Sequence, residues 1–195
     1  MRASHHTVFL IAGPEAGPFT RHLETNPMIA VGNHVPDATL QEFFETEGGG
    51  CSLGPNAFRV ADLTRGRKIV VFGLPGAFTP TCSAKHVPGY VAQAAAFQAA
   101  GVDEIWCVSV NDAFVMGAWA RDQQTGGKVR MMADGSAEWT RALGLDQDLT
   151  ARGMGVRSKR YALVIDDGVV TQLHVEAPGE FRVSSAEAVL AALRN

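Results

Sequence analysis

The sequence places one cysteine where a thiol could be reactive. Cys82 lies in the stretch GLPGAFTPTCSAKHVPG, residues 73–89, with no second cysteine near enough for a CxxC pair. Thr79 is a typical N-cap residue, so the sequence predicts a helix that begins at Pro80. Cys82 would lie in its first turn, near free backbone N–H groups and the positive end of the helix dipole. This position favours a nucleophilic thiolate, and a buried structural thiol is the alternative.

A helix terminus alone cannot ionise such a thiol. At an ordinary cysteine pKa of about 8.5, about 3% of a thiol is ionised at neutral pH, and lowering that pKa to about 6 requires about 3.4 kcal/mol. A helix dipole supplies about 0.3–1 kcal/mol, and about 2 kcal/mol at best. A cationic side chain must therefore come from elsewhere in the chain. The best candidate is Arg160, at the entrance to a predicted strand, with Arg157 and Lys159 as competitors and a surface salt bridge as its alternative role.

The other two cysteines, Cys51 and Cys107, form no recognisable framework with Cys82. Three widely spaced cysteines fit neither a set of disulfides nor a pair of zinc ligands, which favours a reducing compartment. Cys107 falls in a predicted buried strand, and Cys51 falls in a glycine-rich loop. His86 follows Cys82 by one helical turn, so a Cys–His nucleophilic pair, as in thiol hydrolases, is an alternative interpretation of this helix.

Composition favours a single soluble domain. The 195 residues are 46% hydrophobic and carry a net charge of −3, so nothing points to a nucleic acid or an acidic membrane surface as a partner. No apolar run approaches the roughly 20 residues that span a bilayer, and we expect a cytoplasmic protein. Residues 1–27 lack periodicity and form a predicted N-terminal extension, with organelle targeting as an alternative. Residues 28–195 form the predicted domain.

Strands alternate with helices in the predicted order of elements. Short apolar runs predict three buried strands, at residues 68–75, 104–110 and 128–134. Helical patterns fall at residues 80–101, 112–124 and 136–144, and we expect Pro88 to bend the first and Gly101 to end it. The apolar residues of the second helix, Phe114, Met116 and Trp119, are expected to pack in a core or an interface. The alternation predicts an α/β protein with a thioredoxin-like fold, whose central mixed sheet is flanked by helices.

Further elements are predicted at both ends of this order. Residues 38–46 and 56–63 are expected to form an N-terminal β-ribbon around the glycine-rich loop. Residues 160–176 read as a hairpin that turns at the Asp-Asp-Gly of residues 166–168, which we prefer to a metal site. Ser184 and Glu187 form a predicted capping box before a C-terminal helix. The sequence contains no GxGxxG motif, P-loop or clustered set of metal ligands.

The loop around Cys82 resembles a known motif. The stretch PGAFTPTCS, followed by KHVPGY, resembles the loop that carries the peroxide-reactive cysteine of the peroxiredoxins. Pro75, Thr79 and Cys82 fill its Pro-x-x-x-Thr-x-x-Cys pattern. The resemblance extends to the C-terminus through the stretches CVSVNDAFVMGAWA, KVRMMADGSAEWTRALGLDQDL, RSKRYALVIDDG and GEFRVSSAEAVLAAL. These are similar to the type II class, the atypical peroxiredoxins grouped with the fifth mammalian member.

The resemblance implies an enzyme that reduces hydrogen peroxide and organic hydroperoxides to water and alcohols without a bound cofactor. Cys82 would attack the terminal peroxide oxygen and become a sulfenic acid. Thr79 would orient the peroxide, and Pro75 would shield the sulfur from water. Arg160 would stabilise the thiolate and the charge on the peroxide oxygens, together with the backbone N–H groups of Thr81 and Cys82.

The resemblance also bears on how the sulfenic acid is recycled. Some type II members carry a resolving cysteine in the region that reads GEFRVSSAEAV here and holds serines instead. Glutathione, with glutaredoxin as its partner, is therefore the expected reductant, and a homodimer is the expected assembly. One alternative is recycling by thioredoxin with Cys107 as the resolving thiol, since Cys107 aligns with a second cysteine of plant and some bacterial members. A resolving role for Cys51, and a peroxide sensor or holdase with little turnover, are further alternatives.

Overall fold

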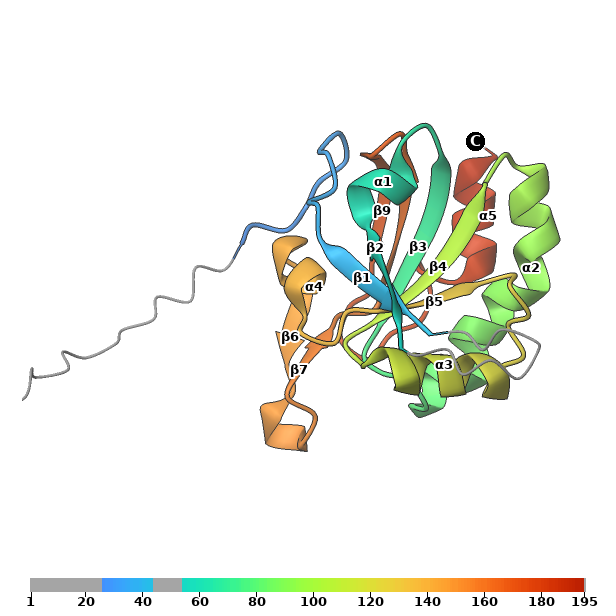
Figure 1. Cartoon of the computed structure of the whole chain (residues 1–195). Coiled ribbons are helices and arrows are strands. Elements are labelled where there is room, and N and C mark those ends of the chain that lie inside the picture. The colour runs from blue at the N-terminus through green and yellow to red at the C-terminus, as the bar shows by residue number, and fades with distance from the viewer. Residues whose placement is uncertain (1–25, 44–53, 195) are drawn as a thin grey trace, which may run out of the picture.

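A computed structural model of the chain describes residues 26–43 and 54–194. Within them lies a seven-stranded sheet with the strand order β2-β1-β5-β4-β3-β8-β9, and a two-stranded sheet of β6 and β7 (Figure 1). The strands are β1 Thr39–Glu42, β2 Asn56–Arg59, β3 Lys68–Leu74, β4 Glu104–Ser109, β5 Arg130–Ala133, β6 Asp146–Asp148, β7 Val156–Ser158, β8 Tyr161–Asp166 and β9 Val169–Val175. The predicted extension, apart from its last two residues, lies outside the described residues.

The centre of the large sheet is parallel and its flanks are antiparallel. β4 pairs in parallel with both β3 and β5, whereas β8 runs antiparallel to β3 and β9 runs antiparallel to β8. Buried central strands require near-continuous apolar runs, and KIVVFGL in β3 is such a run. This mixed sheet, covered by helices, is the predicted thioredoxin-like fold. The loop after β3 lies at the carboxyl edge of the parallel strands, where active sites of open α/β sheets commonly form.

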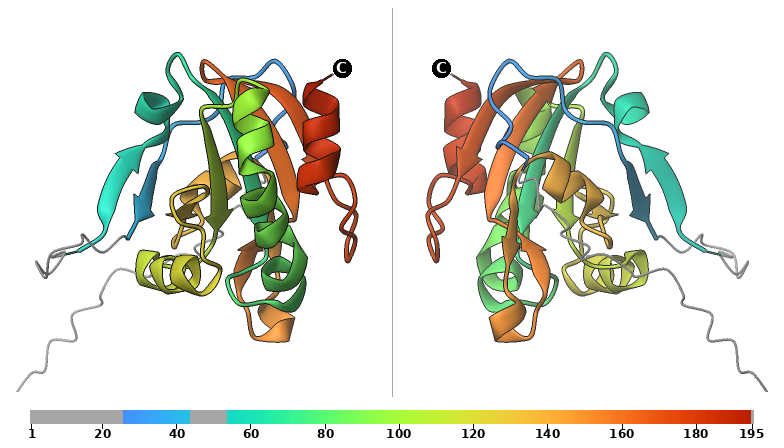
Figure 2. Two further views of the ribbon diagram at one scale, coloured as in Figure 1. Left: turned by 90° about the vertical axis from the view of Figure 1, so that its right-hand side faces the viewer. Right: turned by 90° about the vertical axis from the view of Figure 1, so that its left-hand side faces the viewer.

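Helices cover both faces of the sheet, as the views in Figure 2 show. Two hydrophobic cores of buried side chains form, one on each face. Successive residues of β3 alternate between them, because side chains along a strand point to opposite faces. Phe72 packs in one core with residues of α2, α3 and α5, and Val71 packs in the other with residues of α1 and α4. The helices are α1 Val60–Thr64, α2 Val87–Ala99, α3 Ala113–Asp122, α4 Glu138–Ala142 and α5 Ala186–Leu193. None of these described helices has the length and hydrophobicity that crossing a membrane requires.

The predicted N-terminal ribbon forms, but its second strand ends earlier than expected. β1 and β2 pair antiparallel, and Gln41 also pairs with Ala133 of β5, so the ribbon is the edge of the large sheet. The expectation that residues 60–63 continue the strand is wrong, because they begin helix α1. Val60 and Thr64, four residues apart, are both buried, which is the spacing of a helix face. Most of the glycine-rich loop, including Cys51, lies outside the described residues.

The C-terminal half contains one confirmed turn and one missed element. Asp167 and Gly168, both with positive φ, form the two-residue turn that joins β8 to β9, as the Asp-Gly pair predicts. The segment between α4 and β8, for which the sequence predicts no helix or strand, contains the β6–β7 pair and a 3₁₀ turn at Thr150–Arg152. These strands have three residues each, too few for a period to show in the sequence.

The predicted capping box of the last helix is wrong by one residue. The N-cap of α5 is Ser185, whose hydroxyl oxygen accepts a hydrogen bond from the N–H of Ala188 at 3.3 Å. Ser184 is fully buried, and its hydroxyl donates to Glu176 instead. With Ser185 at the N-cap, Glu187 is one position short of the place that a capping box requires.

Candidate active site

The helical segment before α2 begins where the sequence predicts. Pro80 is its first helical residue, and the N–H of Ser83 donates to the carbonyl oxygen of Thr79 at 3.0 Å, which closes the first turn. The N–H groups of Thr81 and Cys82 precede that bond and therefore have no partner within the helix. The hydroxyl of Thr79 donates to the carbonyl oxygen of Gly76 at 2.9 Å, so it braces the loop, and its oxygen can still accept a hydrogen bond.

Cys82 is fully buried and begins a π-helical turn. The turn spans Cys82–His86, and the N–H of Val87 donates to the carbonyl oxygen of Cys82, five residues back. Pro88 follows Val87 and has no N–H to continue the regular ladder, and the π-helical turn lies on its N-terminal side. The bend expected at Pro88 stays a prediction. Single π-turns within helices occur frequently at functional sites. Gly101, with a φ of 82°, ends the helix as predicted.

Arg160 lies beside the sulfur of Cys82. Its Nη2 donates to Sγ at 3.4 Å, although the two residues are 78 positions apart in the chain. The sheet brings them together, because Gly73 at the end of β3 pairs with Tyr161 at the start of β8. The loop that leads to Cys82 and the residue before β8 therefore meet at one edge. A guanidinium group at this distance can stabilise negative charge on the sulfur.

His86 contacts the same guanidinium group. Arg160 Nη1 donates to Nδ1 of His86 at 3.0 Å, and the Nε2–H of His86 donates to the carbonyl oxygen of Ser184 at 3.1 Å. These partners require a neutral imidazole with its proton on Nε2. Burial, followed by the charge of Arg160, lowers the pKa of His86 to about 3. The Cys–His pair is therefore wrong, because both nitrogens of His86 are engaged and neither can take a proton from Cys82.

Aromatic rings surround the pair formed by Arg160 and His86. The ring centroid of Phe181 lies 5.7 Å from the guanidinium carbon and 5.0 Å from the centroid of the imidazole. Phe72 packs 4.8 Å from the imidazole and stacks on Tyr90 at 4.1 Å. Apolar surroundings exclude water and strengthen the electrostatic interaction between the guanidinium group and a charge on the sulfur.

The competing cations are not bonded to the sulfur. Arg157 Nη1 donates to the carbonyl oxygen of Val110 at 3.0 Å, and its Nε donates to that of Met154 at 2.8 Å. These bonds hold Arg157 against the active-site loop, where a Cβ at Gly76 would lie 3.3 Å from Nη1. Lys159 makes no hydrogen bond to the sulfur in the described part of the chain. Arg160 is therefore the cation that contacts Cys82.

Cys107 has the properties of a structural thiol. It is fully buried in β4, where it pairs with Phe72 of β3 and Met131 of β5. Burial raises the pKa of its thiol well above the ordinary value, and the neighbouring Cys82 raises it further. Cys107 is therefore protonated at neutral pH and a weak nucleophile.

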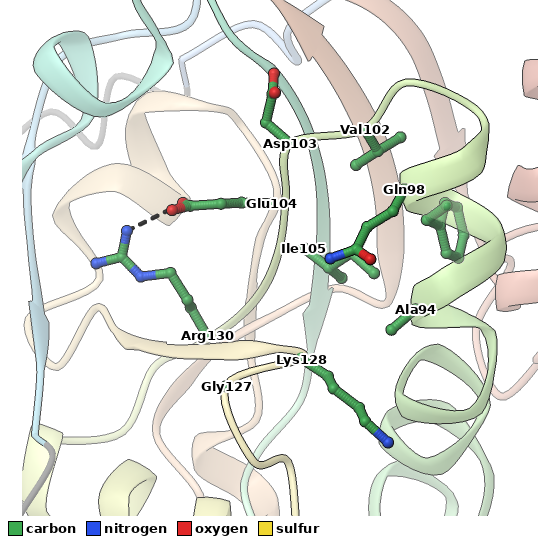
Figure 3. Close-up of a pocket in the computed structure, with 10 residues that line it drawn as sticks. Ala94, Gln98, Val102, Asp103, Glu104, Ile105, Gly127, Lys128 and Arg130 are labelled. Carbon is green, nitrogen blue, oxygen red and sulfur yellow. Dashed lines mark hydrogen bonds and ion pairs between the residues drawn. The ribbon is translucent and has the colours of Figure 1, made fainter.

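A pocket at the opposite end of the parallel strands does not belong to this site. It lies between the end of α2 and the starts of β4 and β5, and Figure 3 shows Arg130 in an ion pair with Glu104 at its rim. The carboxyl edge that carries Cys82 is at the other end of β3. Among the described residues, no group of three or more His, Cys, Asp or Glu side chains could hold a metal ion.

Sequence reasoning did not identify the segment that follows β9 as part of the site. Phe181 packs on Arg160, the carbonyl oxygen of Ser184 accepts from His86, and the carboxylate of Glu176 accepts from Ser184. Two of these contacts use a backbone carbonyl or an aromatic face, for which residue type gives no specific signal. The burial of Glu176 is visible only in the folded structure, so the sequence offers no specific signal for this residue either.

Comparisons with known proteins agree with this architecture. Residues 30–190 match the Redoxin family, within the predicted domain of residues 28–195, whose start stays a prediction. Peroxiredoxin-2B of Arabidopsis thaliana is 50% identical over 165 residues, which cover 85% of this chain and 98% of the relative. Chloroplastic and mitochondrial peroxiredoxins of the same plant also match.

Two solved structures extend the comparison. Reduced Prx3 from Vibrio vulnificus in complex with hydrogen peroxide is 50% identical, with a TM-score of 0.78 over 85% of this chain and 99% of that chain. A Burkholderia cenocepacia protein, provisionally described as a thioredoxin reductase, is 68% identical, with a TM-score of 0.81 over 85% of this chain and 98% of that chain. The chain therefore belongs to the redoxin family and, within it, to the peroxiredoxins.

Proposed function

We propose that this protein reduces hydrogen peroxide and organic hydroperoxides with Cys82 as the nucleophile, and that glutathione and glutaredoxin restore the thiol. The observation that carries the proposal is the guanidinium Nη2 of Arg160 at 3.4 Å from Sγ, in a buried site at the start of a helix. The similarity to a Vibrio vulnificus structure that holds hydrogen peroxide supports the same substrate class.

The proposed reaction begins with attack of the Cys82 thiolate on the terminal oxygen of the hydroperoxide. The S–O bond forms as the O–O bond breaks, and the leaving oxygen takes a proton and departs as water or an alcohol. The Thr79 hydroxyl accepts a hydrogen bond from the hydroperoxide and orients it. Arg160 and the N–H groups of Thr81 and Cys82 stabilise negative charge on the oxygens in the transition state. Pro75, which follows the last residue of β3, shields the sulfur from water.

Two further thiols complete the proposed cycle. Glutathione attacks the sulfenic acid, displaces water and forms a mixed disulfide with Cys82, and a thiolate of glutaredoxin then attacks the glutathione sulfur and releases the enzyme thiol. The burial and protonation of Cys107 support an external thiol over an internal disulfide. Recycling by thioredoxin with Cys107 as the resolving thiol is the second candidate, supported by the position of this thiol in the same core as Cys82.

The proposal includes a homodimer and a cytoplasmic location. Exposed apolar side chains on the segments around the site support self-association: Phe78 is 54% exposed, Phe114 is 58% exposed and Val183 is 43% exposed. Size-exclusion chromatography with light scattering tests the assembly. Because chloroplastic and mitochondrial relatives exist, a fluorescent fusion of residues 1–27 tests the alternative that this segment directs the protein to an organelle.

Two alternatives to a peroxidase, a peroxide sensor or holdase and a thioredoxin reductase, make different predictions. A peroxide sensor or holdase would form the sulfenic acid but show little steady-state turnover. The description of the Burkholderia cenocepacia relative as a thioredoxin reductase implies a dinucleotide site, and this sequence has neither a GxGxxG motif nor a CxxC pair. The sequence therefore supports the peroxidase over the reductase.

The deciding experiment measures peroxide consumption with separate reductant systems. We expect turnover with glutathione, glutaredoxin and glutathione reductase, read as NADPH oxidation, and complete loss in Cys82→Ser. Faster turnover with thioredoxin, lost in Cys107→Ala, would instead support the second candidate. Mass spectrometry of the oxidised protein then distinguishes glutathione on Cys82 from a disulfide between Cys82 and Cys107. Wild-type protein that consumes no peroxide with either system would refute the proposed function.

A further inference from the structure

A buried carboxylate lies behind the pair formed by Arg160 and His86. Glu176 follows β9 and is only 8% exposed, and its backbone N–H donates to the carbonyl oxygen of Arg160 at 3.0 Å. Its Oε1 accepts three hydrogen bonds: from the N–H of Arg182 at 2.6 Å, the N–H of Ser184 at 2.8 Å and the hydroxyl of Ser184 at 2.8 Å. One carboxylate oxygen therefore fixes the turn of residues 182–184.

This carboxylate is charged at neutral pH. Burial by itself would raise the pKa of Glu176, but the hydrogen bonds donated by Ser184 and Arg182 outweigh burial and leave the pKa below its ordinary value. Its other oxygen, Oε2, is buried and has no hydrogen-bond partner within the described residues. Burying Oε2 without a hydrogen-bond partner costs free energy. A side chain that served only to hold the 182–184 turn would not need to bury this second oxygen.

The turn that Glu176 holds presents one carbonyl group to the active site. The carbonyl oxygen of Ser184 accepts hydrogen bonds from Nε2–H of His86 at 3.1 Å and from the hydroxyl of Tyr90 at 3.0 Å. Two donors converge on a single oxygen whose own residue is fixed from the other side by Glu176. The position of the 182–184 turn therefore determines which nitrogen of His86 carries the proton.

The tautomer of His86 decides whether Arg160 has a partner. With the proton on Nε2, the Nδ1 lone pair accepts from Arg160 Nη1 at 3.0 Å. With the proton on Nδ1, two N–H donors would face each other, and the guanidinium group would have to turn away. Since the other arm of the same planar group reaches the sulfur of Cys82, such a turn would also move Nη2 from Sγ.

We propose that Glu176 is a positioning residue for Arg160. Its carboxylate holds the 182–184 turn, the Ser184 carbonyl keeps the His86 proton on Nε2, and Nδ1 stays open to the guanidinium group beside Cys82. This inference rests on the proposed function in one respect, which is that Arg160 assists the reacting sulfur.

The test compares Glu176→Gln with Glu180→Gln, an exposed glutamate in the same segment, as a matched control. The reaction of Cys82 with hydrogen peroxide is followed in a single turnover at pH 7. We expect Glu176→Gln to lower the second-order rate constant by about 10- to 100-fold, as a misplaced catalytic group does, and Glu180→Gln to leave it unchanged. A Glu176→Gln rate equal to that of the control would overturn the proposal.

A double-variant comparison separates positioning from general loss of structure. In an Arg160→Ala background, Glu176→Gln should change the rate by no more than about twofold, because residues that act through one group are not additive. Full additivity of the two losses would mean that Glu176 acts without Arg160, which contradicts the proposal. Circular dichroism and thermal unfolding confirm that each variant is folded.

Two further measurements keep the test decisive. If Glu176→Gln does not fold, Ser184→Ala removes only the hydroxyl donor, and it should slow the reaction in the wild-type background but not in Arg160→Ala. The rate at which iodoacetamide alkylates Cys82 reports the guanidinium group without any peroxide. The same non-additive loss in alkylation would support the positioning role even if the protein consumed no peroxide, and an unchanged alkylation rate in Glu176→Gln would overturn it.

Discussion

Removing the guanidinium group of Arg160 should slow the attack of Cys82 on peroxide far more than it changes the fold. Arg160 is partly buried, and its Nη2 lies 3.4 Å from Sγ. It precedes β8 and is not one of the buried core residues, so Arg160→Ala leaves both hydrophobic cores intact. The loss therefore reports on the charge beside the sulfur.

The size of the effect follows from that distance. Two unit charges 3.4 Å apart interact by about 5 kcal/mol at an effective dielectric constant of about 20. Solvent screens a partly exposed guanidinium group, so this is an upper value, and hydrogen bonds to charged groups contribute about 1.5–3 kcal/mol net. A loss of that size from the transition state corresponds to a rate about 10- to 100-fold lower. Arg160→Lys keeps the positive charge but not the fork that reaches both Cys82 and His86. Its rate should therefore fall between the rates of the wild type and Arg160→Ala.

The assay is a single turnover of reduced protein with hydrogen peroxide. Intrinsic fluorescence can follow it, because Trp119 donates from Nε1 to the hydroxyl of Ser83, next to Cys82, at 3.1 Å. Dimedone trapping and mass spectrometry confirm the sulfenic acid. Arg65→Ala, which removes an exposed arginine before β3, at the far end of that strand, serves as the control. An Arg160→Ala rate within about threefold of this control would refute the electrostatic reasoning.

Three other predictions address the surroundings of the site. Cys107→Ala should keep turnover with glutathione and glutaredoxin within about twofold of wild type, since a buried, protonated thiol takes no part in that cycle; loss of NADPH oxidation in a folded variant would contradict this. His86 has a pKa of about 3 when folded, below its ordinary 6.5, so the unfolded state binds the extra proton and stability falls by about 1.4 kcal/mol per pH unit as pH drops below about 6.5. Urea unfolding at pH 7 and pH 5 measures how steeply the unfolding free energy depends on pH. This dependence should be weaker in His86→Asn than in the wild type, and an equal dependence in both proteins would contradict the prediction. Gly73→Ala places a Cβ 2.1 Å from Cε1 of Tyr161 and should lower the unfolding free energy by about 3 kcal/mol, which the same titrations measure; stability equal to wild type would show that the ring can move aside.

Local signals predicted much of this fold. The apolar run in β3, the Asp-Gly turn at residues 167–168 and the start of a helix at Pro80 depend on residues next to one another in the chain, and the structure has all three. Where the local signal was weak, the prediction failed. VADLT is too short for its helical spacing to outweigh the strand before it, and two adjacent serines, Ser184 and Ser185, could each have capped α5.

The sequence by itself determined that Cys82 stands in the first turn of a helix, because an N-cap, a proline and a cysteine act over a few residues. Only the tertiary structure decided which cation meets the sulfur. Arg157, Lys159 and Arg160 all carry a positive charge near the start of β8, and the register that pairs Gly73 with Tyr161 selects the last of them. The tertiary structure also decided that His86 contacts Arg160 and not the sulfur, since the tautomer of His86 depends on a carbonyl group 98 residues away. Interactions between distant segments are set by strand pairing and packing, which no short stretch of sequence contains.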